Sequence, residues 1–418
     1  MTVAKKVESK VPQLRFSEFR ESWLKIDLGD YLEFKNGINA DKDSYGSGYK
    51  FINVLDVIGA STITHNSIIG SVSVDEKTFI KNKVSFGDIL FQRSSEIREE
   101  AGQSNIYLDA EHEVTFGGFI IRGKAKKKFD PVYMNYLLKT WLARKEIVTK
   151  AGGSTRFNVG QDSLSKVRLY SSQSLSEQNK ISILFTSLDK KTSLLKQKHE
   201  QLVLYKKGIM QQLFSQQLRF KDDTGQDFPD WEVKTLGSLA SKVSKKNKDD
   251  SIKNVLTNSA KQGIVNQLDY FDKDIANENN LTNYYVVEKD DFVYNPRISV
   301  HAPVGPIKRN NIDQGVMSPL YTVFRIKNPE MLNFLEIFFS TTQWYRYMNS
   351  IANFGARHDR MNITSSDFFL LPMKIPSDKE RDKLVDFVKS LDKKINLTQQ
   401  QIEQTQAYKK GLLQQMFV

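Results

Sequence analysis

The sequence predicts an α+β protein in which two mixed α/β domains alternate with two long helices, arranged as an internal repeat. Ser187–Lys191 (SLDKK) returns as Ser390–Lys394. Tyr205–Phe214 (YKKGIMQQLF) returns as Tyr408–Phe417 (YKKGLLQQMF). Both pairs keep an offset of 203 residues, which is too long a period for a solenoid. We therefore expect two like halves, related by a pseudo-two-fold and suited to a partner that is itself two-fold or bipartite.

The first part of each half, residues 1–173 and 218–376, is predicted to be a mixed α/β domain. Short runs of β-forming residues, such as Tyr49–Val54, are bounded by Gly, Asn and Asp. Apolar positions with helical spacing predict a helix at 131–150 in the first domain and at 330–350 in the second. The two domains share landmarks and differ elsewhere. The matched landmarks are Leu14–Phe16 and Trp23 with Leu218–Phe220 and Trp231, and Gly87–Phe91 with Asp290–Tyr294.

The second part of each half, residues 174–217 and 377–418, is predicted to be a long helix. Mostly apolar residues recur there at alternating spacings of four and three, beginning at Ile181 and, in the same register, at Leu384. This is the spacing of a coiled-coil seam. Neither segment contains proline, and about 40 residues of helix span roughly 60 Å. We expect the two helices to pair antiparallel within the chain, as a pseudo-two-fold between duplicated halves requires.

Two local features of these helices also follow from the sequence. Ser174 and Ser377 are expected as N-caps, each followed three residues later by a glutamate in the capping-box pattern. One glycine inside each duplicated segment, Gly208 and Gly411, costs about 1 kcal/mol relative to alanine. A close helix crossing or a contact with a partner protein would explain these glycines.

The composition describes a globular, basic chain without cysteine. Hydrophobic residues make up 39% and aromatic residues 11%, no apolar run reaches the roughly 20 residues of a membrane span, and the charged N-terminus does not resemble a signal peptide. The absence of cysteine excludes disulfides, thiolate metal sites and cysteine nucleophiles, and it fits a cytoplasmic protein. The 61 Lys and Arg against 49 Asp and Glu give a net charge of +12, which favours a polyanionic partner, with nucleic acid first.

Several motifs come close to an enzyme site and fail. Gly118–Lys124 lacks the hydroxyl residue that ends a P-loop and is predicted to be a strand. Asn295–Arg297 lacks the second proline and the aromatic of an amino-methyltransferase motif, and Pro229–Lys234 places its Asp and Glu too close together for a metal-dependent nuclease. The five histidines show no metal-ligand spacing. The sequence therefore favours binding over catalysis.

Loops that follow the predicted strands are rich in Arg, Asn, Gln and Gly in both halves. Arg suits guanine, Asn and Gln suit adenine, and Gly lets the backbone approach a phosphate. Recurrence at similar places in both halves favours DNA contacts over ordinary solvated loops. The candidate DNA-binding residues are Arg93, Arg98, Gln103, Arg156 and Asn158 in the first half, and Asn295, Arg297, Arg357, His358, Arg360 and Asn362 in the second.

Four features form a specific set: Pro12–Phe16 followed by Trp23, Phe86–Arg93 (FGDILFQR), Ser174–Ile181 (SLSEQNKI) and the duplicated helix ends. As a set they resemble the specificity subunits of type I restriction–modification systems, over essentially the whole chain. The second half departs from the pattern at Asp290–Pro296 and at Lys379–Arg381.

That resemblance implies two target-recognition domains, 1–173 and 218–376, each binding one half of a bipartite double-stranded DNA site, with the helices setting the spacer. Two modification subunits would dock mainly on the helices, and restriction subunits carrying the motor and nuclease would join them. S-adenosylmethionine, ATP and magnesium would be used by those partners, so this chain would be non-catalytic and need no cofactor or metal. The expected partner-binding residues are Tyr205, Lys206, Lys207, Tyr408, Lys409 and Lys410.

Two alternatives from other classes stay open. A DNA-modifying enzyme, either a methyltransferase or a nuclease, would act on DNA without partner subunits. A scaffold would recruit proteins through its helices and bind no DNA at all.

Overall fold

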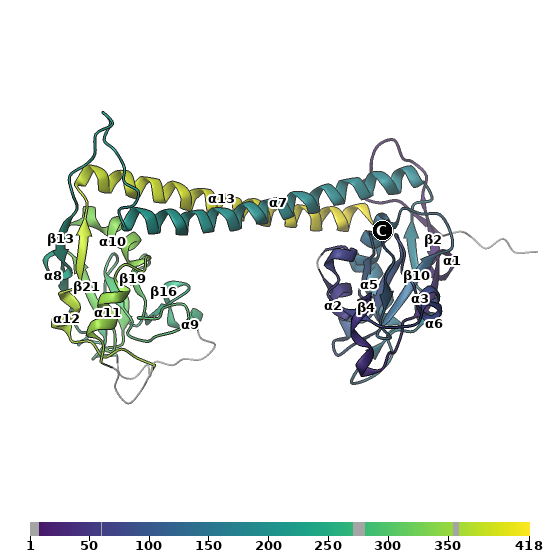
Figure 1. Ribbon diagram of the computed structural model, residues 1–418, viewed down its shortest axis with the longest axis horizontal. Helices are drawn as coiled ribbons and strands as arrows, with labels where there is room; N and C mark the ends of the chain where they lie inside the picture. The colour runs from purple at the N-terminus through teal and green to yellow at the C-terminus, as the bar shows by residue number, and fades with distance from the viewer. Residues whose placement is uncertain (1–7, 60, 271–280, 354–358) are drawn as a thin grey trace, which may run out of the picture. The chain divides into compact units, whose positions relative to one another are not determined.

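A computed structural model divides the chain into two compact units. Unit 1 contains residues 1–196 and 399–418, and unit 2 contains residues 197–398. Each unit consists of a mixed α/β domain and one end of each long helix (Figure 1). The predicted α+β class with an internal repeat is therefore confirmed. The described residues are 8–59, 61–270, 281–353 and 359–418.

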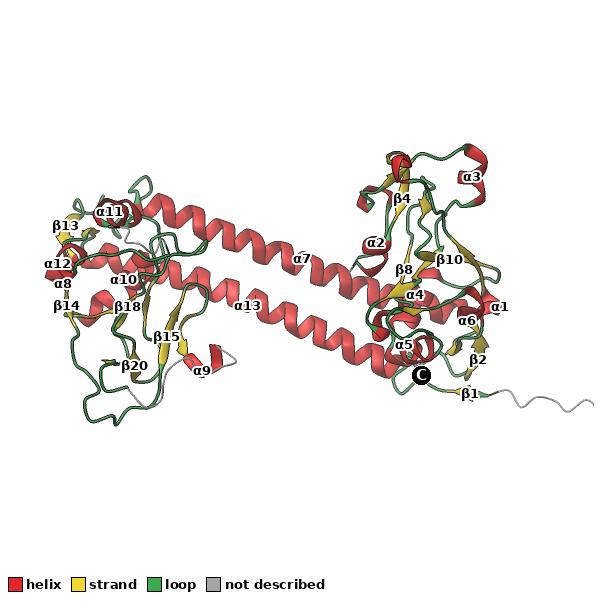
Figure 2. Cartoon of the chain, turned by 90° about the horizontal axis from the view of Figure 1, so that it is seen from below, coloured by secondary structure: helices red, strands yellow, loops and turns green. Residues whose placement is uncertain are grey.

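The same four-stranded antiparallel sheet lies at the centre of both domains. Its strand order is β3–β10–β6–β8 in unit 1 and β14–β21–β18–β19 in unit 2, so each strand has a counterpart. Figure 2 labels β8 and β10 of the first sheet and β14 and β18 of the second. A smaller sheet is repeated as well, since β2 pairs with β12 and β13 pairs with β22. The bounds are β2 Trp23–Asp27, β3 Leu32–Asn36, β6 Ile89–Gln92, β8 Ser104–Ile106, β10 Ile120–Ala125, β12 Arg168–Ser171, β13 Glu232–Thr235, β14 Ala240–Lys242, β18 Phe292–Tyr294, β19 Ile307–Arg309, β21 Thr322–Ile326 and β22 Pro372–Ile375.

Two consecutive helices stand where one was predicted in each domain. The helix expected at 131–150 is interrupted at Thr140, which has an extended backbone and whose hydroxyl caps the second helix by accepting from Ala143 N at 3.3 Å. The helix expected at 330–350 is likewise interrupted between residues 340 and 344. The bounds are α4 Pro131–Lys139, α5 Trp141–Thr149, α10 Leu332–Phe339 and α11 Tyr345–Ile351, with the short helices α1 Leu28–Tyr31, α6 Gln161–Ser165, α8 Leu236–Leu239 and α12 Ser365–Phe369.

The remaining elements differ between the two domains. Unit 1 joins β4 to β5 and, in parallel, to β9, and β7 pairs with β11. Unit 2 instead has a β15–β16 hairpin and a β17–β20 pair. The bounds are β1 Ser9–Lys10, β4 Tyr45–Ile52, α2 Val54–Ile58, β5 Ser71–Val72, α3 Glu76–Lys81, β7 Ser94–Ser95, β9 Thr115–Phe116 and β11 Phe157–Asn158, then β15 Leu256–Ser259, β16 Gly263–Asn266, α9 Gln267–Tyr270, β17 Tyr285–Val287 and β20 Gly315–Met317.

A buried aspartate directly precedes β6 in unit 1 and β18 in unit 2, which we call the central strands. Asp88 and Asp291 each accept a hydrogen bond from the backbone N–H three residues earlier, at 3.0 and 2.8 Å. Each also faces an arginine of the neighbouring strand: Arg325 donates to both oxygens of Asp291 at 2.7 and 2.9 Å, whereas Arg122 lies 4.0 Å from Asp88. Because burial outweighs these contacts at the looser pair, the pKa of Asp88 is raised. The matched aspartates thus define how the central strand begins.

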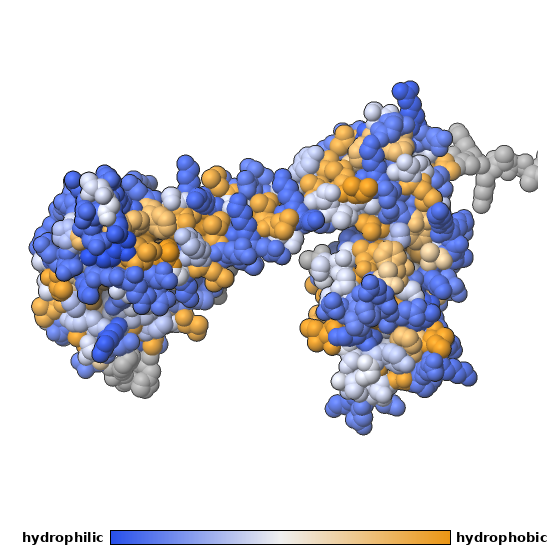
Figure 3. Space-filling model, turned by 45° about the horizontal axis from the view of Figure 1, so that its top comes forward, coloured by the Kyte–Doolittle hydropathy of each residue, from blue (hydrophilic) through white to orange (hydrophobic). Residues whose placement is uncertain are grey.

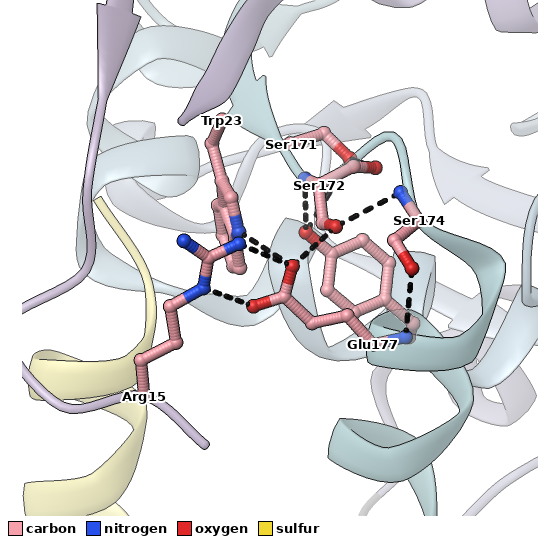
Figure 4. Close-up of polar contacts among 7 residues, drawn as sticks. Arg15, Trp23, Ser171, Ser172, Ser174 and Glu177 are labelled. Carbon is pink, nitrogen blue, oxygen red and sulfur yellow. Dashed lines mark hydrogen bonds and ion pairs between the residues drawn. The ribbon is translucent and has the colours of Figure 1, made fainter. Parts of the chain in front are cut away.

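A buried glutamate fastens the leading segment of each domain to the start of a long helix. In Figure 4, Arg15 donates to both carboxylate oxygens of Glu177 at 2.6 and 2.9 Å, and Trp23 Nε1 donates at 3.1 Å. In unit 2 the corresponding distances are 3.1, 2.9 and 3.0 Å. We call each set a latch: Arg15, Trp23 and Glu177 in unit 1, and Arg219, Trp231 and Glu380 in unit 2.

The latches change what was predicted for the helix starts. Ser174 Oγ accepts from Glu177 N at 3.3 Å, but the glutamate carboxylate binds in the latch, so the predicted capping box is only half formed. Helix α13 begins directly after Ser377, whose carbonyl accepts from Arg381 N at 2.8 Å, as predicted for an N-cap. The Ser377 Oγ, however, is buried without a hydrogen-bond partner in the described part of the chain, so the side-chain cap is missing. A Cβ added at Gly208 or Gly411 would meet no atom within 4 Å, so a close helix crossing does not explain these glycines.

The two predicted long helices are α7, Leu175–Phe214, and α13, Asp378–Met416. Their predicted seam residues are buried or half-buried, while most residues between them are exposed. An ion pair joins the helices in each unit: Asp189 with Lys409 in unit 1 and Lys206 with Asp392 in unit 2, both at 2.5 Å. The four partners are again two residues repeated at an offset of 203.

The phenylalanine that ends each duplicated segment closes the core of a unit. Phe417 lies with its ring 5.8 Å from Trp23 and 5.9 Å from Phe185. Since residue 417 lies beside 185 while 409 lies beside 189, the helices run antiparallel in unit 1, as predicted. In unit 2, Phe214 packs on Trp231 at 6.1 Å, and the same core contains the first turns of α13.

Candidate nucleic-acid interface

The candidate residues gather where the central strand of each sheet ends. β6 continues into Arg93, and β18 continues into residues 295–297. A segment from the end of the domain pairs with each: Val159 N donates to Arg93 O at 2.9 Å, and Met361 N donates to Pro296 O at 3.0 Å. Arg93 and Pro296 are 203 residues apart, so both halves build this junction alike. We call the surface around Arg93 and Val159 in unit 1, and the surface around Pro296 and Met361 in unit 2, the strand-end faces.

A glycine with left-handed backbone completes each face. Gly102 has φ of +68° and Gly305 has φ of +78°, again at an offset of 203. In both halves the carbonyl of the residue after this glycine accepts a hydrogen bond from the end of the strand. Gln92 N donates to Gln103 O at 2.7 Å in unit 1, and Asn295 N donates to Pro306 O at 3.0 Å in unit 2. At Gly305 a Cβ would lie 2.1 Å from the carbonyl oxygen of Asn295, so no larger residue fits.

In unit 1 the face presents two accessible arginines. Arg156 is exposed, with its closest carboxylate 3.8 Å away. The Arg98 guanidinium lies 5.8 Å from the centre of an aromatic ring of β11, and Arg93 Nη1 donates to a backbone carbonyl at 3.4 Å. The amide of Asn158 is fully engaged, because its Oδ1 accepts from Ser94 Oγ and its Nδ2 donates to the Arg156 carbonyl at 3.1 Å. Asn158 is exposed, but both ends of its amide hold the loop.

In unit 2 a pocket of about 330 Å³ lies at the face, with Arg297 and Arg360 in its lining. The two arginines stand on facing backbone segments, and Asp359 lies 3.8 and 4.0 Å from them. The Asn295 amide is engaged within the protein, as the Asn158 amide is in unit 1. Its Nδ2 donates to the Asn258 carbonyl and its Oδ1 accepts from Arg297 N, both at 3.0 Å. Two arginines are again the accessible donors.

Asn258 belongs to this site and was missed in the sequence. Its side chain is 2% exposed, and its Nδ2 donates to the carbonyls of Val293 and Pro306 at 2.7 and 3.1 Å, which ties β15 to the end of the central strand. No pattern marks it, since the position 203 residues earlier is Leu55. Of the other predicted residues, Asn362 is exposed beside the face, and Arg357 and His358 lie outside the described residues.

A second surface lies on the helix pair, where apolar side chains are exposed (Figure 3). Tyr408 is 60% exposed and accompanied by Leu194 in unit 1, and Tyr205 is 52% exposed and accompanied by Leu397 in unit 2. Each of the four immediately precedes a seam residue. Because the helices are antiparallel, both members of a unit's set point to the same side of the pair. We call these sets the outer pairs.

The opposite side of the helix pair faces the domain of its own unit. Asp189, which immediately follows a seam residue, accepts from the Tyr136 hydroxyl at 2.6 Å. The leucines of the outer pairs were missed, although each lies eleven residues, or three turns, before the tyrosine of its helix. Of the predicted partner-binding residues, Tyr205, Lys207, Tyr408 and Lys410 are exposed, whereas Lys206 and Lys409 are engaged between the helices.

Residues 20–204 match the family described as the type I restriction modification DNA specificity domain. The chain is 24% identical to the putative type I restriction enzyme MjaX specificity subunit of Methanocaldococcus jannaschii, over 97% of this chain and 95% of that protein. The chain is thus similar to the type I specificity subunits over nearly its whole length. This family is named for specificity and not for catalysis, so the subunit is non-catalytic and the alternative of a DNA-modifying enzyme is not favoured.

Solved structures of type I specificity subunits share the fold. The subunit from M. genitalium superposes with a TM-score of 0.55 at 15% identity, over 98% of this chain and 99% of that one. The HsdS subunit of Thermoanaerobacter tengcongensis gives 0.51 at 14% identity, over 94% and 95%. A chain from a study of type I complex assembly and conformational transition gives 0.56 at 12% identity, over 94% and 97%.

Neither a metal-ion site nor a membrane-spanning helix is present among the described residues. No group of three or more His, Asp and Glu side chains there is placed to hold a metal ion. Within the same residues, no helix combines the length and apolar character that crossing a membrane requires.

Proposed function

We propose that this specificity subunit binds a bipartite double-stranded DNA site, with domain 1–173 on one half and domain 218–376 on the other. The observation that carries the proposal is the strand-end face, which recurs in both units with two accessible arginines each. Arginine forks fit guanine edges and phosphates. The faces differ in sequence within a common backbone frame, so the two half-sites need not be alike.

Within each face, the residues divide into two roles. Arg98 and Arg156 in unit 1, and Arg297 and Arg360 in unit 2, contact DNA. Asn158 and Asn295 position the loops that carry these arginines, because their amides are already engaged within the protein.

The helices dock two modification subunits through the outer pairs. Tyrosine is enriched among the residues that carry most of the binding energy of protein interfaces, and the repeated set offers two equivalent sites. Restriction subunits join that complex. The partner subunits, and not this chain, bind and use S-adenosylmethionine, ATP and magnesium. The length of the continuous helices sets the spacer between the half-sites.

The experiment compares Arg156→Ala with Arg360→Ala in the full-length chain, together with the subunits that it purifies with. Each variant is expected to weaken binding at one half-site only, by about 1–3 kcal/mol, while leaving the other unchanged. Binding to duplexes altered in one half-site at a time measures this. Arg168→Ala and Arg346→Ala remove exposed arginines elsewhere in the same units and serve as controls.

Equal losses at both half-sites for each variant would reassign these arginines to phosphate contacts. Loss of neither half-site would leave the proposed faces without a role. DNA methylation or cleavage by the chain alone, with S-adenosylmethionine or magnesium, would overturn the non-catalytic assignment. Tyr408→Ala and Tyr205→Ala should each reduce the amount of modification subunit that copurifies, without changing the preferred sequence.

A further inference from the structure

A groove of about 700 Å³ lies beside the strand-end face of unit 2. The β15–β16 hairpin separates the groove from the 330 Å³ pocket of that face. Thr257–Ala260 line the pocket, and Lys261–Val265 line the groove. The other walls of the groove are β19, α10 and the two long helices. Any strand of DNA that passes the hairpin tip from the pocket therefore reaches this groove.

The lining is strongly cationic, with five Lys and Arg against two carboxylates. Asp392 pairs with Lys206 at 2.5 Å. Glu336 lies 3.2 Å from Arg309, whose guanidinium also binds Asp290 at 2.6 Å. The remaining three cations make no ion pair in the described part of the chain. They are Lys261, Lys308 and Lys389.

The three lysines come from separate elements that converge on one space. Lys261 is at the hairpin tip, Lys308 is in β19 and Lys389 is in α13. Lys308 is half-buried, and burial lowers its pKa. An ammonium in such a place gains from an anionic ligand that replaces its lost hydration.

The helix ion pair of unit 1 has different surroundings. There, Asp189 binds both Lys409 and the Tyr136 hydroxyl, and the Lys409 ammonium lies 5.1 Å from the Tyr136 ring centre. The helix pair is thereby closed onto α4, whereas Asp392 in unit 2 pairs with Lys206 across the helices.

We infer that this groove binds phosphates of the DNA that leaves the unit 2 half-site, extending the contact from the half-site into the spacer. The inference rests on the proposed DNA-binding function. Lysines are point charges that suit phosphates and carry no base preference. Lys389 immediately follows a seam residue, on the domain side of the helices and opposite the outer pair, so a docked modification subunit would not cover it.

The test measures how the association constant depends on salt for the variant K261A/K308A/K389A, as full-length chain with its copurifying subunits. The slope of log K against log salt should fall in magnitude by about 2–3, and affinity for target and unrelated duplexes should fall by the same factor, about tenfold or more at 0.1 M salt. The triple K261R/K308R/K389R should retain both values. K221A/K234A/K374A removes the same charge from exposed positions outside the groove and should change neither.

Three results would overturn the inference: an unchanged slope, a loss confined to the target duplex, or intact DNA binding with loss of a copurifying subunit. The last would assign the groove to an acidic protein segment. The variant R297A/R360A separates this outcome from failure of the proposed function. If the arginine variant loses sequence preference and the lysine triple has no effect, only the groove inference fails; if neither changes DNA binding, the proposed function of unit 2 fails as well.

Discussion

Trp141 and Trp344 occupy the same position in the two halves and have opposite surroundings. Trp141 is 66% exposed, with the Lys145 ammonium 4.9 Å from its ring centre. Trp344 is 2% exposed and donates from Nε1 to the Phe339 carbonyl at 3.3 Å. The latches, by contrast, make closely similar contacts in both units, and the aspartates before β6 and β18 keep the same backbone hydrogen bond. The halves therefore share a polar frame and differ in how apolar space is filled.

Physical chemistry explains why the frame and the filling behave differently. A buried charge needs its partner, so neither member of a latch can change alone without leaving the other unpaired. Apolar side chains can be exchanged more freely when volume is kept. At one position of the strand that follows each aspartate, unit 1 has the buried Leu90 and unit 2, 203 residues later, has the buried Val293.

The latches should give the largest effect. Glu177→Ala and Glu380→Ala each remove the buried carboxylate that a half-buried arginine and an indole N–H share, and each is expected to cost about 3 kcal/mol. The cost should be larger for Glu177, which also accepts from Ser172 Oγ at 2.5 Å. Urea unfolding followed by tryptophan fluorescence measures both. Glu18→Ala, which removes an exposed carboxylate, is the control. If Glu177→Ala and Glu380→Ala lower the free energy of unfolding no more than Glu18→Ala does, the latches do not stabilise the shared frame.

The parts of the fold that were predicted are those encoded locally in sequence. The seam, the helix ends and the antiparallel pairing follow from a short period and a duplicated segment. The latches could not be predicted, because Glu177 binds Arg15, which lies 162 residues away, while the local capping-box pattern favoured Ser174. Thr140 interrupts a predicted helix for a similar reason: a single side-chain cap outweighs the apolar spacing around it.

The candidate site was predicted by residue type more reliably than by role. The arginines of both strand-end faces are accessible, but the amides of Asn158 and Asn295 are engaged within the protein, and composition cannot reveal orientation. Asn258 lies on a hairpin that exists in one half only, so the repeat gave no sign of it. The leucines of the outer pairs could have been found from their three-turn spacing to the tyrosines.

The aspartates before the central strands should show an intermediate effect that differs between the halves. Asp291→Asn loses a bidentate bond to Arg325 and is expected to cost about 1–3 kcal/mol. Asp88→Asn gives up a contact of 4.0 Å and keeps an acceptor for the backbone, so it should cost less than about 1 kcal/mol at neutral pH. Equal costs would mean that the arginine contact is irrelevant to the frame.

The two variants should also differ with pH. The pKa of Asp88 is raised above its ordinary value of 3.8, because burial disfavours the charged form. The folded state then binds the proton more tightly, so the contribution of Asp88 to stability is greatest below pH 3.8 and falls as pH rises through its raised pKa. The stability advantage of the natural chain over Asp88→Asn should shrink over that range. An advantage that grows with pH would contradict the raised pKa.

The ion pairs between the helices should give the smallest effect and the finest comparison. Lys206 with Asp392 is a partly exposed pair, and its coupling energy in a double-mutant cycle of alanine variants should be about 0.2–1 kcal/mol. Lys409 with Asp189 is equally exposed, but Asp189 also accepts from Tyr136, so Asp189→Ala should cost about 1 kcal/mol more than Asp392→Ala. Tyr136→Phe should remove that difference, because it deletes the hydroxyl that donates to Asp189. If the difference persists in Tyr136→Phe, the closure of the helices onto α4 depends on apolar packing around Phe185 instead.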